Sequence, residues 1–255
     1  MYFIIRSFFT FIFLFFIYLN LKIIYLNEKD YYLFLFFLLY IPILSYYYYK
    51  KNLAIKALIK DIIITKYSNN IYISKSLNIK TDIINKIINS YSSNKPLYII
   101  SIDEYSKDEN LDLHNSAFSY KNIKLSFIVL GSYKDNLCKL LPLLAHELEH
   151  INKNHLYIRK IFDQFSAISI FILFYFLYNQ NLFITSFILV TFASLYTYIK
   201  ITLIRSQEYS ADKASYKLSG REDSIALLNT INDDSKGFQP HPKAIDRIKR
   251  IESYL

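Results

Sequence analysis

Residues 144–150 read LAHELEH and contain the pattern HExxH. His146 and His150 are four positions apart, so on an α-helix both imidazoles lie on one face and can reach the same metal ion. Glu147 is adjacent, and its carboxylate can take a proton from a water molecule that the metal activates. Residues 134–154 read as one helix, with Pro142 near its first turns. The stretch therefore predicts a metal-binding helix that carries its own general base.

An alternative interpretation is a solvated polar helix face with two unrelated histidines. The leucine-rich run at residues 140–145 argues against it, because it draws the helix into a core. Two histidines and two glutamates in such a helix need partners, since burying unpaired polar groups is costly.

Zinc in a catalytic site takes three protein ligands and keeps a fourth position open. Residues 204–212 read IRSQEYSAD and place Glu208 and Asp212 four positions apart, on one face of an expected helix. This spacing alone is typical of a solvated face, but an HExxH motif without a third ligand favours a metal-linked role. One carboxylate would bind zinc, and the other would accept the second N–H of a ligating histidine and fix its tautomer.

The composition limits the class of protein. Of 255 residues, 53% are hydrophobic and 20% are charged. The chain is therefore too apolar for disorder and more apolar than an ordinary soluble domain. The single cysteine, Cys138, excludes an intrachain disulfide framework and a CxxC metal site. Despite the net charge of +9, we expect no nucleic-acid partner, because no stripe of basic and aromatic residues lies outside the expected membrane flanks.

Four charge-poor stretches predict about four transmembrane helices. They cover residues 7–26, 31–49, 161–178 and 181–199. A helix of about 20 residues crosses roughly 30 Å of hydrocarbon, and the third stretch is marginal in length. The alternative is two spans followed by an interfacial or buried hairpin. The first stretch lacks a small-residue cleavage site, so we expect a retained anchor rather than a signal peptide.

Positive charges flank these stretches on one side only, which predicts a multi-pass protein of the inner (cytoplasmic) membrane with its site facing the cytoplasm. The loops at 27–30 and 178–181 carry no net positive charge. The lysines on the other side would lie beside anionic lipid. The flanking cations are Lys50, Lys51, Arg159, Lys160, Lys200 and Arg205.

This pattern divides the chain into four parts. We expect two transmembrane helices in residues 1–49, a first catalytic part in 50–160, a helical hairpin in 161–204 and a second catalytic part in 205–255. The first catalytic part is predicted to contain helices at 52–66 and 82–91 and strands at 97–102 and 124–130. The expected fold class is a mainly α membrane protein with a small α+β domain.

The ordered set of motifs resembles the membrane-bound zinc metallopeptidase family that includes the heat-shock protease HtpX and the type I CAAX prenyl endopeptidases. The resemblance implies a zincin-like domain of the gluzincin type, with an HExxH helix and a glutamate ligand. Glu149 stands where the family commonly has glycine, which puts an extra charge near the metal. The matching segments are Asn115–Phe118 (NSAF), Phe127–Leu130, Leu144–Ile151 (LAHELEHI), Arg205–Asp212 (RSQEYSAD) and His241–Ile248 (HPKAIDRI).

The resemblance implies a role for each matching residue. His146, His150 and Glu208 would bind one Zn²⁺ per chain, and Glu147 would be the general base. Asp212 would hydrogen-bond a ligating histidine.

Four further residues carry weaker expectations. By the same resemblance, His241 would stabilise the oxyanion; its alternative role is to start a helix before a proline. Arg205 is expected to pair with one of the two carboxylates or to form a structural salt bridge. His114 and His155 match no ligand position, so we expect both to be surface or loop residues.

The expected substrate is an extended segment of protein. The strand that contains Phe127, Ile128 and Val129 would pair with the substrate backbone as an edge strand, and Asn115 would contact the substrate nearby. We therefore expect an endopeptidase that cleaves unfolded or misfolded membrane-proximal proteins, with the lipid bilayer as its other partner.

Two other functions remain open from the sequence. One is a regulated protease with a single target. The other is a catalytically impaired scaffold or chaperone-like member of the same fold, for which Glu149 is the only sign. Prenylated-peptide cleavage fits less well, since that branch of the family has more spans.

Overall fold

The computed structural model divides the chain into two compact units, Met1–Asp61 and Ile62–Leu255. The described residues all belong to the second unit, so the first two predicted spans lie outside them, as do His114 and Asn115. The described residues are 64–68, 70–77, 79–101, 117–121, 125–131, 137–177, 182–230 and 241–254.

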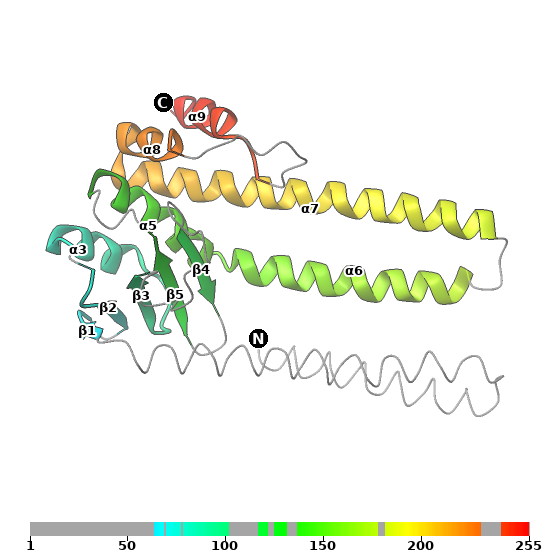
Figure 1. The fold of residues 1–255 in the computed structure, drawn as a ribbon, viewed down its shortest axis with the longest axis horizontal. Coiled ribbons are helices and arrows are strands. Elements are labelled where there is room, and N and C mark those ends of the chain that lie inside the picture. Colours follow the sequence, from blue (N-terminus) through cyan, green and yellow to red (C-terminus); the bar gives the residue numbers. More distant parts are fainter. Residues whose placement is uncertain are drawn as a thin grey trace. The chain divides into compact units, whose positions relative to one another are not determined.

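A five-stranded mixed sheet forms one layer of this unit, with strand order β1-β2-β3-β5-β4 (Figure 1). β3 lies parallel to β2 and to β5, whereas β1 and β4 run antiparallel to their neighbours. β5 therefore lies inside the sheet, between β3 and β4. The strands are β1 (Ile64–Lys66), β2 (Ile71–Ser74), β3 (Leu97–Ser101), β4 (Ala117–Lys121) and β5 (Ser126–Leu130).

Two helices pack on one face of the sheet and form the core with it. α3 (Thr81–Ser90) connects β2 to β3 and buries three isoleucines. α5 (Leu137–Asn152) buries Leu144 and Leu148 beside Ile99 and Ile128, and all four are at most 2% exposed. The apolar face of α5 thus holds the helix against the sheet and fixes the direction of its polar face.

Two long helices follow, α6 (His155–Leu177) and α7 (Leu182–Ser219), and they run side by side away from the sheet (Figure 1). Among the described residues, one helical segment, Ser186–Ser219, is long and apolar enough to cross a membrane. Its large side chains face outward: Phe187, Val190 and Tyr198 are 65–70% exposed. The described residues thus support one of the four predicted spans.

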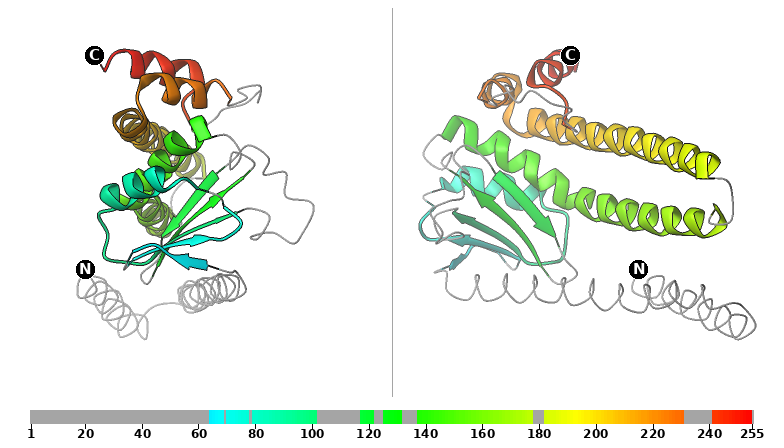
Figure 2. Two further views of the ribbon diagram at one scale, coloured as in Figure 1. Left: turned by 90° about the vertical axis from the view of Figure 1, so that its left-hand side faces the viewer. Right: turned by 45° about the vertical axis from the view of Figure 1, so that its right-hand side comes forward.

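The C-terminal half of α7 is part of the α+β unit. It contacts α5, and the short helices α8 (Arg221–Leu228) and α9 (Ala244–Glu252) lie beside its C-terminal end (Figure 2). Gly220, with φ of 93°, separates α7 from α8. The expected division at residue 204 therefore falls inside one continuous helix, which joins the apolar segment to the site.

The prediction of a helix over residues 52–66 is wrong at its C-terminal end. Residues 64–66 form β1, which pairs with β2. The run Ile62–Thr65 consists of β-branched residues, which favour a strand once a neighbouring strand is available.

Candidate metal centre

The site begins with the polar face of α5, which turns away from the sheet core toward α7. His146, Glu147 and His150 lie on it, and each is at most 8% exposed. Glu208 reaches them from α7 and is 4% exposed. The structure thus brings together side chains that are 58 or more residues apart in the chain.

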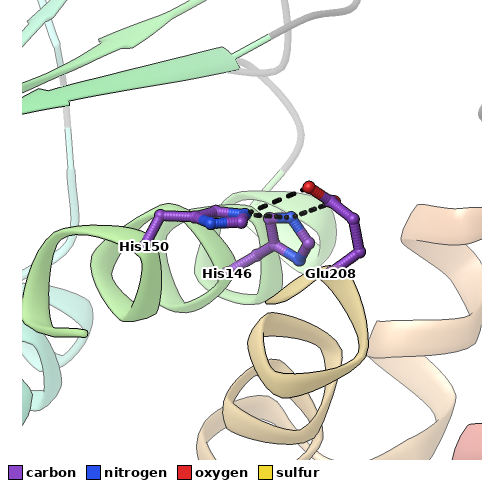
Figure 3. Close-up of side chains that lie close together, drawn as sticks. All are labelled: His146, His150 and Glu208. Carbon is purple, nitrogen blue, oxygen red and sulfur yellow. Dashed lines mark hydrogen bonds and ion pairs between the residues drawn. The ribbon is translucent and has the colours of Figure 1, made fainter. Parts of the chain in front are cut away.

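Three ligand atoms converge in this space (Figure 3). His146 Nε2 is 3.2 Å from His150 Nε2 and 3.4 Å from Glu208 Oε2. His150 Nε2 is 3.6 Å from Glu208 Oε1. In a tetrahedral zinc site with bonds of about 2.0–2.1 Å, neighbouring ligand atoms are about 3.3–3.4 Å apart. One ligand atom from each of the three residues lies within 4.8 Å of the other two, close enough for the three to bind one zinc ion.

The electrostatics of the two histidines also fit a metal. A ligating imidazole must be unprotonated at the bonding nitrogen. Burial, together with the nearby His146, lowers the pKa of His150 to about 2, so its ring is neutral at pH 7. Burial alone would lower the pKa of His146 as well, but hydrogen bonds with Asp212 and Glu208 outweigh it and raise this pKa to about 9. Without a cation, His146 thus holds a proton that a metal ion would replace.

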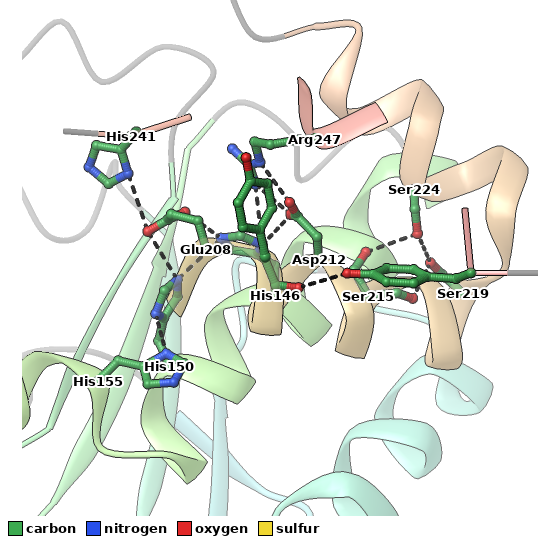
Figure 4. A network of polar contacts seen from close by, with 12 residues as sticks. His146, His150, His155, Glu208, Asp212, Ser215, Ser219, Ser224, His241 and Arg247 are labelled. Atoms are coloured by element: carbon green, nitrogen blue, oxygen red, sulfur yellow. Dashed lines mark hydrogen bonds and ion pairs between the residues drawn. The ribbon is translucent and has the colours of Figure 1, made fainter. Parts of the chain in front are cut away.

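Asp212, which Arg247 binds, contacts His146 at its Nδ1 atom (Figure 4). His146 Nδ1 lies 3.1 Å from Asp212 Oδ1. Arg247, from α9, donates to both oxygens of Asp212, from Nη2 at 2.6 Å and from Nε at 2.8 Å. A carboxylate held in this way accepts the Nδ1–H of the imidazole and leaves Nε2 for the metal. Arg247 has no role in the sequence prediction, although it lies in the matched segment HPKAIDRI.

The prediction that Arg205 pairs with a site carboxylate is wrong. Arg205 is exposed, whereas Arg159 on α6 donates from Nη2 to Glu208 Oε1 at 3.0 Å. Arg205 precedes Glu208 by three residues on α7, but its side chain is exposed, whereas Glu208 and Asp212 are buried. The cation that contacts Glu208 therefore comes from a neighbouring helix.

His241 lies at the rim of the site, where its side chain is 51% exposed. Its Nδ1 is 3.2 Å from Glu208 Oε1, so it is close to the expected ligands (Figure 4). Glu149, the residue expected to add charge near the metal, accepts a hydrogen bond from Ser210 Oγ at 3.1 Å. Its carboxylate therefore has its own partner on α7.

The expectation that His155 is a surface or loop residue is wrong. His155 begins α6 and is 6% exposed, and its Nδ1 lies 2.9 Å from Nδ1 of His150. Burial and the nearby Arg159 lower its pKa to about 4, so the ring is neutral at pH 7. A spacing of five residues does not predict this contact, because residues five apart do not face each other on a helix. The contact depends on the turn between α5 and α6.

Glu147 is buried beside the three donors. Burial raises its pKa, while His146 and a hydrogen bond from Ser119 on β4 act in the opposite direction. A carboxylate with a raised pKa is a better proton acceptor at neutral pH than an ordinary glutamate. Its position next to the donors suits a general base.

The prediction that Phe127, Ile128 and Val129 pair with substrate is wrong. All three lie in β5, whose two edges are occupied by β3 and β4, and each is at most 2% exposed. The sequence prediction missed β4, so it placed β5 at the edge of the sheet. Asn115, which precedes β4, lies outside the described residues.

Together, the α+β fold and this donor set define a class of protein. An HExxH helix that meets a glutamate from a later helix is typical of zinc peptidases with two histidine ligands and one glutamate ligand. Residues 117–255 match peptidase family M48, which is more than half of the chain. The chain belongs to this family, whose members are zinc metalloendopeptidases, and the predicted resemblance is confirmed.

A solved structure shows the same fold. The crystal structure of Ste24p from S. mikatae matches over 92% of this chain and 61% of that chain, with a TM-score of 0.52 and 19% sequence identity. This chain thus spans 61% of the length of that structure. Comparison with the curated proteins gives no match.

Proposed function

We propose that the chain is a membrane-integrated, zinc-dependent endopeptidase. The observation that carries this proposal is the convergence of three buried donors, His146, His150 and Glu208, beside the buried carboxylate of Glu147. These residues would hold a zinc ion, which would supply Lewis-acid chemistry for a water molecule and for the scissile carbonyl.

The chain's own residues then move the protons. Glu147 takes a proton from the attacking water and later delivers it to the leaving amine. Its raised pKa suits both roles, because a carboxylate with a raised pKa holds a transferred proton more readily than an ordinary glutamate does. His241, exposed at the rim, would donate a hydrogen bond to the oxyanion that develops on the substrate.

Two arginines pair with buried carboxylates around the proposed metal site. Three carboxylates are buried here, those of Glu147, Glu208 and Asp212. Arg247 binds Asp212, and Arg159 binds Glu208. Because buried carboxylates are stable only when they are paired or bound to a metal, the two arginines lower the cost of assembling the site.

We assign substrate pairing to β4 instead of β5. β4 is the outermost described strand on this side of the sheet, and it lies next to α5. Ser119 of β4 hydrogen-bonds Glu147, so the strand passes directly beside the proposed general base. A substrate added to β4 must be extended, which favours unfolded or misfolded segments.

The location of the site favours substrates close to the membrane. Glu208 is nine residues beyond Ile199, where the apolar stretch of α7 ends, and this corresponds to about 14 Å along a helix. Such proximity supports a role in membrane protein quality control. By the charge asymmetry of the flanks, the site faces the cytoplasm and the protein lies in the inner membrane.

The two alternative functions have less support. An impaired scaffold would lack a working site, yet Glu147 and the three donors are all in place, and Glu149 is bound to Ser210. A regulated protease with one target would use the same chemistry and differ only in the breadth of its substrates.

Cleavage of an unfolded model protein by the detergent-purified chain tests the proposal. We expect cleavage by the wild type, its loss in Glu147→Gln, and its loss with a chelator followed by recovery when zinc is added. Equal cleavage by the wild type and Glu147→Gln would contradict the proposed base.

A further inference from the structure

The contact between His150 and His155 has no role in the function proposed above. The two Nδ1 atoms are 2.9 Å apart, and the rings meet edge to face, with centroids 5.0 Å apart and planes at 76° (Figure 4). Both side chains are 6% exposed. At this distance one nitrogen donates a hydrogen and the other accepts it.

Metal binding decides which ring donates. A neutral imidazole carries one hydrogen, on either Nδ1 or Nε2. The Nε2 atom of His150 faces His146 and Glu208, so a bound metal requires a lone pair there. The hydrogen of His150 must then be on Nδ1, where the partner within 2.9 Å is His155.

We propose that His155 is a positioning residue for the metal ligand His150: its Nδ1 accepts the Nδ1–H of His150 and so keeps Nε2 directed at the metal. This inference rests on the proposed zinc site. Beyond the zinc site, it states that His150 has its own hydrogen-bond acceptor in His155, as His146 has in Asp212.

The turn between α5 and α6 makes this contact. α5 ends at Asn152, and Asn154 has a φ of 57°, in the left-handed region that asparagine tolerates better than most residues. Lys153 and Asn154 donate backbone hydrogen bonds back to Glu149 and Ile151. The turn is thus tied to α5, and His155, the first residue of α6, is returned to the side of His150.

The two acceptors differ in charge. Asp212 is an anion held by Arg247, whereas His155 lies close to Arg159, whose guanidinium is bound to Glu208. The site already contains three buried carboxylates for two arginines. A neutral acceptor orients His150 without adding a fourth buried anion, which would raise the cost of desolvation.

Two substitutions of similar size separate an acceptor role from a packing role. In His155→Asn, the side-chain carbonyl occupies nearly the position of Nδ1 and can accept the same hydrogen bond. In His155→Leu, a methyl group takes that position and accepts nothing. Lys153→Gln, at an exposed position in the same turn, is the control.

The measurement is the zinc affinity of the full-length chain in detergent, by competition with a chelator, together with the melting temperature of each metal-free variant. We expect His155→Leu to weaken zinc binding about 10–100-fold, as loss of such hydrogen-bond partners typically does. We expect His155→Asn to restore most of the affinity and Lys153→Gln to match the wild type.

Three results would overturn this inference. Equal zinc affinity of wild type and His155→Leu would do so and would leave the zinc peptidase proposal intact. Equal weakening in the Asn and Leu variants would show that the ring serves only to fill space. A wild-type chain that binds no zinc would overturn the proposed function and this inference together.

Discussion

At the scale of single residues, the site depends on pairs of side chains that hold one another. His146 contacts Asp212, which is fixed by Arg247, and Glu208 contacts Arg159. Each pair joins helices that are far apart in the sequence. Removing one member therefore leaves a buried charge or a misdirected ligand behind.

Arg247→Met should destabilise the fold. Asp212, which is 3% exposed, would lose both hydrogen bonds from the guanidinium and keep only its contact with His146. Breaking such a pair typically costs about 3–5 kcal/mol. Denaturant unfolding of the metal-free protein measures the loss. The double variant Arg247→Met/Asp212→Leu removes both charges and should recover much of it; a double variant as unstable as the single one would contradict this explanation.

The stability of the metal-free protein should fall as the pH rises from about 6.5 to about 9. The folded pKa of His146 is raised from 6.5 to about 9. A raised pKa means that the protonated ring stabilises the fold, fully below pH 6.5, and that this contribution disappears as the pH rises through 9. Thermal unfolding across this range measures it, with His146→Gln as the reference. Parallel curves for wild type and His146→Gln would contradict the prediction.

At the scale of elements, the orientation of α5 and α7 and the edge of the sheet determine the geometry of the site. The leucines of α5 face the sheet, and the histidines of α5 face α7. The apolar pattern of α5 therefore sets the direction of the site. α7 extends from the apolar segment to Glu208 without interruption. β4 lies beside α5 and sets the line along which an extended substrate would pass.

Backbone methylation of a peptide substrate tests the assignment to β4. If the substrate pairs with β4, a methyl group on an amide that faces the strand removes one hydrogen bond, worth about 0.5–1.5 kcal/mol, and lowers kcat/KM by about 2–10-fold. Methylation of the next amide, which points away from the strand, is the control. Equal effects along the peptide would contradict strand pairing.

The elements that the sequence predicts are those with a regular apolar pattern. The strands at 97–102 and 124–130 and the helix at 134–154 correspond to β3, β5 and α5 within a few residues. β4 reads AFSYK, which has little apolar signal, and it becomes a strand only by pairing with β5. Missing it put β5 at the edge and misplaced the substrate contact.

The same reasoning applies to the site. The donors His146, His150 and Glu208 belong to motifs with a fixed spacing, so the sequence pointed to them. His155, Arg159 and Arg247 act across helix contacts or a turn, and no spacing links them to the residues they hold. Their roles require the packing of α5, α6, α7 and α9, which a local pattern does not contain.

At the scale of the whole molecule, one helix, α7, contains both a candidate membrane span and the proposed metal ligand Glu208. In the described part of the chain, Ser186–Ser219 meets the length and composition for a span, and its large apolar side chains face outward. The same helix ends among the buried residues of the α+β unit. If this segment spans the membrane, insertion and assembly of the site are linked through α7.

Labelling with a membrane-impermeant maleimide tests this orientation. In a Cys138→Ser background, a cysteine in place of Gln180, between α6 and α7 in the sequence, should react from the outer side of the membrane. A cysteine in place of Lys217, exposed near the C-terminal end of α7, should react only in inverted vesicles, because positive flanks face the cytoplasm. Reaction of both from the same side would contradict a membrane-spanning α7.

The zinc content of the purified chain shows whether His146, His150 and Glu208 bind a metal ion. Elemental analysis should find one zinc per chain in the wild type and almost none in Glu208→Gln, because the amide loses the charge of the third ligand. Glu149→Gln is the matched control and should keep one zinc, since Glu149 is bound to Ser210. One zinc per chain in Glu208→Gln, or none in the wild type, would contradict the site built by His146, His150 and Glu208.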